Sequence, residues 1–157
     1  MADNKTVLAQ QVYGKIITAL DNRNWTYKRE DDNLTVRFDV RGDDFPMSMI
    51  MKIDVERQLI RVLSPLPFEM SEDKRMEGAI ATCVASFGLP DGSFDYDITD
   101  GTIGFRLTYA FHDSVIGEDL LQYMISWSLN VIDKYNDKFF AIDKGYLSLQ
   151  DFIASDN

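Results

Sequence analysis

The chain has 157 residues, of which 45% are hydrophobic and 27% are charged, the balance of an ordinary globular protein. Its net charge is −10, and residues 76–157 hold only 4 lysines and arginines against 13 acidic residues. Nucleic acids and anionic membrane surfaces are bound through basic patches, so neither is an expected partner. The acidity favours another protein as the partner, or serves only to keep a monomer soluble.

A single cysteine, Cys83, excludes an internal disulfide and is typical of a reducing compartment. The first five residues lack the basic and apolar segments of a signal peptide. No stretch reaches the roughly 20 apolar residues that span a bilayer. We therefore expect a cytoplasmic protein. No repeat or flexible linker divides the sequence, so residues 1–157 are expected to form one domain.

Apolar residues four apart predict a first helix over residues 6–20, with Asp3 or Asn4 as its N-cap. Alternating patterns then predict four strands, within 25–28, 34–40, 45–55 and 58–63. Their connections are too short for helical crossovers, which indicates an antiparallel meander. Pro65 and Pro67 should end the fourth strand, because proline has no N–H to donate.

A second helix is expected to start at Ser71 as its N-cap and to stop before Gly88. Residues at helical spacing predict its buried face, which comprises Met76, Ile80, Cys83 and Phe87.

Two further strands, near 93–98 and 103–109, should form a hairpin around Asp100-Gly101. A long helix is predicted from Glu118 to about Lys144, with Gly145 as its cap, followed by a short amphipathic tail. The order α-ββββ-α-ββ-α predicts an α+β fold, in which helices pack on one face of an antiparallel sheet.

Catalytic chemistry is not indicated. The only histidine, His112, stands beside Asp113 and Ser114, and adjacent side chains cannot converge as a triad. Cys83 falls on the predicted apolar face of the second helix, where a thiol is usually inert. No glycine-rich phosphate loop is present. We expect no catalytic residue and no cofactor.

A run of acidic residues, Asp95, Asp97 and Asp100 followed by Gly101, resembles the opening of an EF-hand loop. The glycine comes one position late, however, and Arg106 occupies the place of the bidentate glutamate. A cross-strand ion pair with Arg106 is the simpler interpretation, and we expect no metal site.

Methionines on one strand are the unusual feature, because Met47, Met49 and Met51 line the same face. Phe45 and Ile53 share this face, which favours a core position, although Met-rich surfaces can also form adaptable binding grooves. The next strand is apolar on both faces, as a central strand or a partner-covered patch would be. The candidate partner contacts are Met47, Met49, Ile60 and Val62.

Three tracts of the sequence resemble the YbjN family of bacterial proteins, which have been labelled sensory transduction regulators. They are Ser64-Pro-Leu-Pro-Phe68, Glu72-Asp-Lys-Arg75 opening a helix, and Gly92-Ser-Phe-Asp-Tyr-Asp-Ile-Thr-Asp-Gly-Thr-Ile-Gly-Phe-Arg106. The resemblance implies a fold similar to type III secretion chaperones, which are small, acidic and often dimeric. It supplies no catalytic residues.

The expected function is a non-enzymatic protein-binding module, chaperone-like or regulatory, which binds a protein client or regulatory partner and forms a homodimer. Two alternatives stay open: a small-ligand sensor with a pocket between sheet and helices, and a metal-dependent enzyme that uses carboxylates.

Overall fold

The computed structural model describes residues 3–156. The helices are α1 (Asn4–Asn22), α2 (Arg75–Phe87), α3 (Glu118–Asp143) and α4 (Leu149–Asp156), and the short 3-10 helices are η1 (Asp31–Asn33) and η2 (Glu72–Lys74). The strands are β1 (Lys28–Glu30), β2 (Thr35–Arg41), β3 (Pro46–Asp54), β4 (Leu59–Glu69), β5 (Ser93–Tyr96) and β6 (Thr102–Ala110). Within these residues, no helix is both long enough and apolar enough to span a bilayer.

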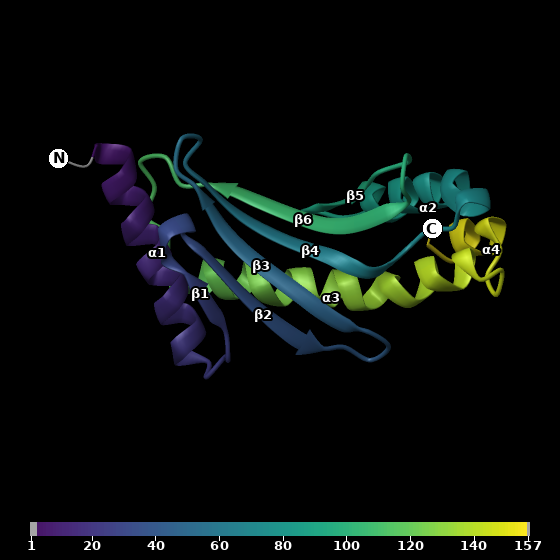
Figure 1. Cartoon of the computed structure of the whole chain (residues 1–157), viewed down its shortest axis with the longest axis horizontal. Coiled ribbons are helices and arrows are strands. Elements are labelled where there is room, and N and C mark those ends of the chain that lie inside the picture. Colours follow the sequence, from purple (N-terminus) through teal and green to yellow (C-terminus); the bar gives the residue numbers. More distant parts are fainter. Residues whose placement is uncertain (1–2, 157) are drawn as a thin grey trace.

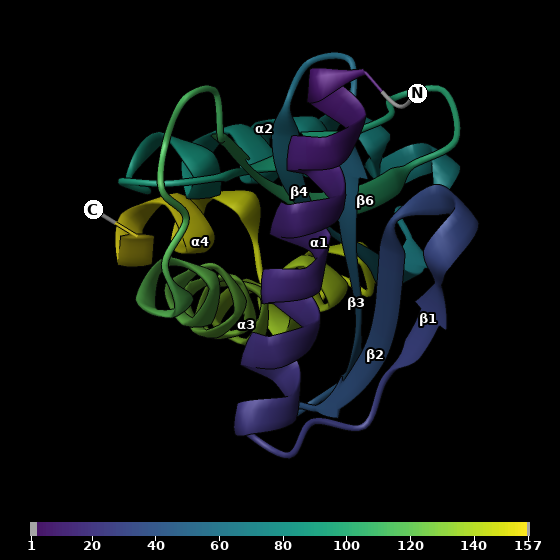
Figure 2. The same ribbon diagram turned by 90° about the vertical axis from the view of Figure 1, so that its left-hand side faces the viewer.

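All six strands pair antiparallel, in the order β1-β2-β3-β4-β6-β5. The predicted meander is confirmed as β1 to β4, and the predicted hairpin as β5 and β6. Figure 1 shows α3 running behind the sheet along the long axis, with α1 at one end and α2 and α4 at the other. In Figure 2, α1 and α3 lie on the same side of the sheet. The predicted α+β fold class is therefore confirmed.

The first and third helices form as the sequence predicts. Asp3 is the N-cap of α1, because its carboxylate accepts a hydrogen bond of 2.7 Å from the Thr6 N–H. Gly145, at φ 75°, follows the end of α3 in the left-handed conformation expected of a C-cap. The apolar face of α3 is buried along the helix: Leu121, Met124, Ile125, Ser128, Val131, Ile132, Tyr135, Phe139 and Ile142.

The fourth strand extends beyond the predicted end and includes both prolines, so that prediction was wrong. The β3–β4 ladder runs from Asp54–Leu59 to Ile50–Leu63 and stops there. From Ser64 onward, β4 pairs only with β6. Pro65 and Pro67 thus lie on an open strand edge, where a missing N–H costs no ladder bond.

Two element starts also differ from the predictions. The first strand begins at Lys28, while Trp25 precedes it and packs its ring 5.3 Å from that of Phe38. The second helix begins at Arg75 after the turn η2, and the Ser71 side chain does not cap it. Instead, the Ser71 N–H donates a 2.6 Å hydrogen bond to Asp143 at the end of α3.

Candidate protein-binding surfaces

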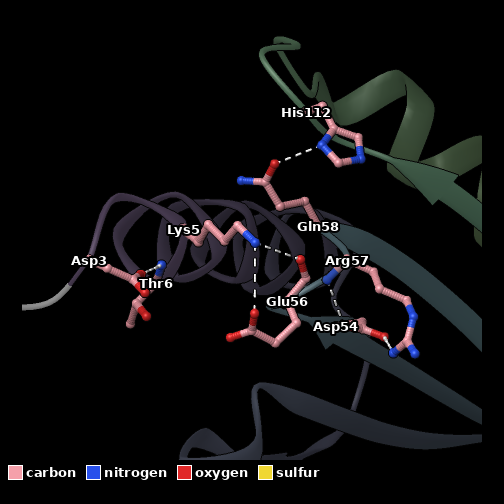
Figure 3. A network of polar contacts seen from close by, with 8 residues as sticks. All are labelled: Asp3, Lys5, Thr6, Asp54, Glu56, Arg57, Gln58 and His112. Carbon is pink, nitrogen blue, oxygen red and sulfur yellow. Dashed lines mark hydrogen bonds and ion pairs between the residues drawn. The ribbon is translucent and has the colours of Figure 1, made fainter.

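The single histidine makes a structural contact. His112 Nδ1 lies 2.8 Å from Gln58 Oε1, which ties the loop after β6 to the β3–β4 turn (Figure 3). The same turn is held to α1 by Lys5, which contacts the backbone oxygen and the carboxylate of Glu56 (Figure 3). The partner of the imidazole is therefore an amide rather than a nucleophile or a carboxylate.

The acidic run that begins in β5 is divided among separate local contacts. Asp95 forms the expected cross-strand pair, because Arg106 donates two hydrogen bonds of 2.8 and 3.0 Å to its carboxylate. Asp97 instead accepts from Thr99, and Asp100 accepts from Thr102. The Thr102 N–H holds the pKa of Asp100 below its ordinary value. Across residues 3–156, no three His, Cys, Asp or Glu side chains are grouped to hold a metal ion.

The four side chains predicted as partner contacts lie in the core. Met47, Met49, Ile60 and Val62 are each exposed by 5% or less. They point from β3 and β4 toward the helices, together with Met51 and Ile53. In this conformation they belong to the hydrophobic core, and their role as partner contacts stays a prediction. The accessible apolar surface of this conformation lies elsewhere.

The apolar face predicted to bury α2 is instead its exposed face, which corrects the sequence-based prediction. Met76, Ile80, Cys83 and Phe87 all face solvent, and Phe87 is 93% exposed. We call these four residues the α2 face. The opposite side of the helix packs inward through its small residues, Gly78, Ala81, Thr82 and Ala85.

Close approach of the helix to its neighbours explains this orientation. A Cβ atom at Gly78 would lie 2.7 Å from Met70 Cγ and 2.8 Å from the Tyr96 hydroxyl oxygen. Only a side of the helix that lacks large side chains fits against these residues, so the large apolar groups point outward. No charged residue occurs between Glu77 and Asp91, so charge in the sequence does not mark which side of the helix meets solvent.

A second surface lies where β3 and β4 separate. The arms of this split are Pro46–Met49 of β3, paired only with β2, and Ser64–Glu69 of β4, paired only with β6. The two arms diverge in Figure 1, with α3 passing behind the gap.

Three half-buried phenylalanines meet beside the split. Phe45 precedes β3, Phe68 lies on β4 and Phe140 comes from α3. Their ring centres are 5.2 to 5.4 Å apart, within the range of favourable aromatic contacts. We call this group the aromatic cluster.

Surface depressions border the same region. One, with a volume of about 580 Å³, extends from Tyr27 and Arg37 across Ser48 and Ile50 to Pro65. Another, of about 470 Å³, runs from Pro65 to Glu69 and along the start of β6. Pro65 therefore stands between two hollows, beside the point where the β3–β4 ladder stops.

The fold is an α+β arrangement in which helices pack against a six-stranded antiparallel sheet. No family model and no curated protein sequence matches the chain. Two solved structures have a similar fold.

One is the HopA1–SchA chaperone–effector complex. A chain of it is 10% identical, with a TM-score of 0.62, and the match covers 87% of this chain and 99% of that one. The other is YbjN from E. coli, proposed to be a transcription regulator. It is 9% identical, with a TM-score of 0.57, and the match covers 78% of this chain and 86% of YbjN. The resemblance seen in the sequence is thus confirmed at the level of the fold.

Proposed function

We propose that residues 1–157 form one YbjN-like domain that acts as a non-enzymatic, cytoplasmic protein-binding module, chaperone-like or regulatory, and works as a homodimer. The observation that carries this proposal is the α2 face, a row of large apolar side chains exposed to solvent. Contiguous exposed apolar patches on soluble domains mark interaction sites. The two similar structures, a chaperone complex and a proposed regulator, support the same class of function.

A second copy of the chain fits the α2 face by symmetry. The spacing of its four residues is four, three and four, which reads the same in both directions. Two antiparallel α2 helices would therefore set Phe87 against Met76 of the other copy, and Ile80 against Cys83. A two-fold axis requires such a self-complementary patch. The absence of charge from Gly78 to Pro90 limits the desolvation penalty of this contact to its Met76 ends, where Arg75 and Glu77 flank the interface.

The test is capture of partner proteins from the native lysate by tagged protein. We expect the wild type to retain proteins above the background of an unrelated acidic protein. The variant Ile80→Asp should no longer retain those partner proteins that bind only to the dimer. Val115→Asp is the matched control, because Val115 is 91% exposed but lies outside α2. Capture at background level by the wild type and both variants would contradict the proposal.

A further inference from the structure

We propose that the aromatic cluster binds a basic segment of a partner protein, one that carries lysine or arginine beside an apolar anchor residue. This inference rests on the proposed protein-binding function and adds the chemistry of the partner. It concerns a different surface from the α2 face, so the two can fail separately.

The apolar part of the surface is built by the three phenylalanines. They come from three elements, and each ring is only half-buried although it touches the other two. The hollow along Pro65–Glu69 includes Phe68 itself. An aliphatic or aromatic anchor from a partner can therefore reach Phe68 through an existing depression, and burial of such side chains commonly dominates binding energy.

Acidic side chains border the cluster. Asp43 and Asp44 directly precede Phe45, and Glu69 directly follows Phe68. Asp133 and Asp137 precede Phe140 by seven and three residues, which places all three on one face of α3. The Asp43 N–H donates a 3.0 Å hydrogen bond to Asp133, so the hairpin and the helix bring these acids together.

Four cations lie near these five acids in the sequence: Arg41, Lys134, Lys138 and Lys144. Two of them, Lys134 and Lys138, hold their ammonium groups over the Tyr135 ring instead. Lys144 is already paired with Asp143 at 3.2 Å. Its ammonium group also lies 5.4 Å from the centre of the Phe140 ring, a cation–π distance. The cluster thus already holds one cation of the chain itself against an aromatic face, which is the contact proposed for the partner.

The backbone at the split also favours a basic partner. Pro46, Pro65 and Pro67 are three of the chain's four prolines, and all lie on its two arms. Each keeps its carbonyl oxygen but has no N–H. The open edges therefore offer more hydrogen-bond acceptors than donors, and lysine and arginine side chains supply donors only. Acceptor-rich edges, acidic side chains and exposed ring faces all favour the same basic partner.

The probe is a short synthetic peptide of lysine, arginine, leucine and tryptophan, titrated by isothermal calorimetry. A matched peptide has glutamine in place of every cation, and another has alanine in place of leucine and tryptophan. Each substitution in the peptide is expected to weaken binding by about tenfold, since the anchor and the charge are both needed.

Protein variants locate the site. Phe45→Ser and the double variant D44N/D137N should each weaken binding by about tenfold. The double variant E118Q/D119N removes as much charge at the other end of α3 and should leave the affinity unchanged. Circular dichroism of each variant checks that the fold is kept.

Three results would overturn the inference. The first is that the wild type does not bind the basic peptide. The second is that E118Q/D119N loses as much affinity for the peptide as D44N/D137N. The third is that Ile80→Asp loses peptide binding while Phe45→Ser keeps it. In the last case the partner surface would be the α2 face. Absence of peptide binding with normal capture of partner proteins would leave the proposed function intact, because only the basic character of the partner would be wrong.

Discussion

Individual polar residues hold the loops of this protein in place. Asp91, in the loop between α2 and β5, accepts hydrogen bonds of 2.8 Å from Tyr109 and 2.6 Å from Tyr123. Trp127 donates to the backbone oxygen of the same residue at 3.0 Å. Burial, together with the hydrogen bond to Asp91, raises the pKa of Tyr109 to about 12 from its ordinary value of 10.0.

Stability should therefore fall with rising pH above the ordinary tyrosine pKa. Between pH 10.0 and about 12, Tyr109 stays protonated in the folded protein while it ionises in the unfolded chain, so alkali favours unfolding. Tyr109→Phe removes this ionisable proton, so the free energy of unfolding should fall less steeply with rising pH in the variant. Urea unfolding at stepped pH measures it, and an equal slope in both proteins would contradict the assignment.

Asp143 joins the end of α3 to the turn before α2. Burial alone would raise its pKa, but the hydrogen bond from the Ser71 N–H and the contact with Lys144 outweigh burial and lower it. Asp143→Asn should cost about 2 kcal/mol of unfolding free energy at neutral pH. Because the folded pKa is depressed, this contribution is lost in acid, so the difference between wild type and variant should shrink there. The exposed Asp32→Asn is the control in urea unfolding.

Among the elements, α3 could be predicted from sequence and the orientation of α2 could not. The apolar face of α3 is continuous over 26 residues, and only burial against the sheet can accommodate it. The second helix has large apolar residues on one side and small ones on the other, and periodicity alone selects the large side as core. Its neighbours Met70 and Tyr96 decide otherwise, and their positions depend on tertiary structure.

The strands show the same division between what sequence could predict and what tertiary structure decides. Alternation identified β2, β3 and β6, because a half-buried strand must alternate. The prolines of β4 cannot donate a ladder hydrogen bond, as the sequence predicted. This ends a strand only if a neighbouring strand lies on the same side, and that depends on the arrangement of the whole sheet. The face shared with Phe45 and Ile53 favoured a core position for Met47 and Met49, and their burial confirms it. The fourth strand is apolar on both faces, so sequence could not say whether the helices cover Ile60 and Val62.

The turn between β5 and β6 offers a test at this scale. Gly101 has φ 82°, and a Cβ there would collide with the backbone of Met70, whose N–H donates a 2.8 Å hydrogen bond to the Gly101 carbonyl oxygen. Gly101→Ala should therefore destabilise the protein by about 1–3 kcal/mol. Gly14→Ala, in α1 with open space around the added methyl, should instead stabilise it by about 0.5–1 kcal/mol. Thermal unfolding compares the two, and similar effects of the same sign would contradict the packing described.

At the scale of the whole molecule, charge and apolar exposure are segregated. Three of the four residues of the α2 face lie in a stretch without charge, and the aromatic cluster lies among acids. This separation underlies the two proposals, one surface for a second copy of the chain and another for a basic partner. The sequence indicated a protein partner through its net charge of −10, but the surfaces follow from the packing of α2 and from the β3–β4 split.

The most direct test of the central claim, that α2 presents an interface, is the mass in solution by sedimentation equilibrium. We expect wild type and Val115→Asp to have twice the 18.0 kDa mass of the chain, and Ile80→Asp to have the mass of a single chain. A wild type that stays at 18.0 kDa at every concentration would contradict the account, because the α2 face would then remain uncovered.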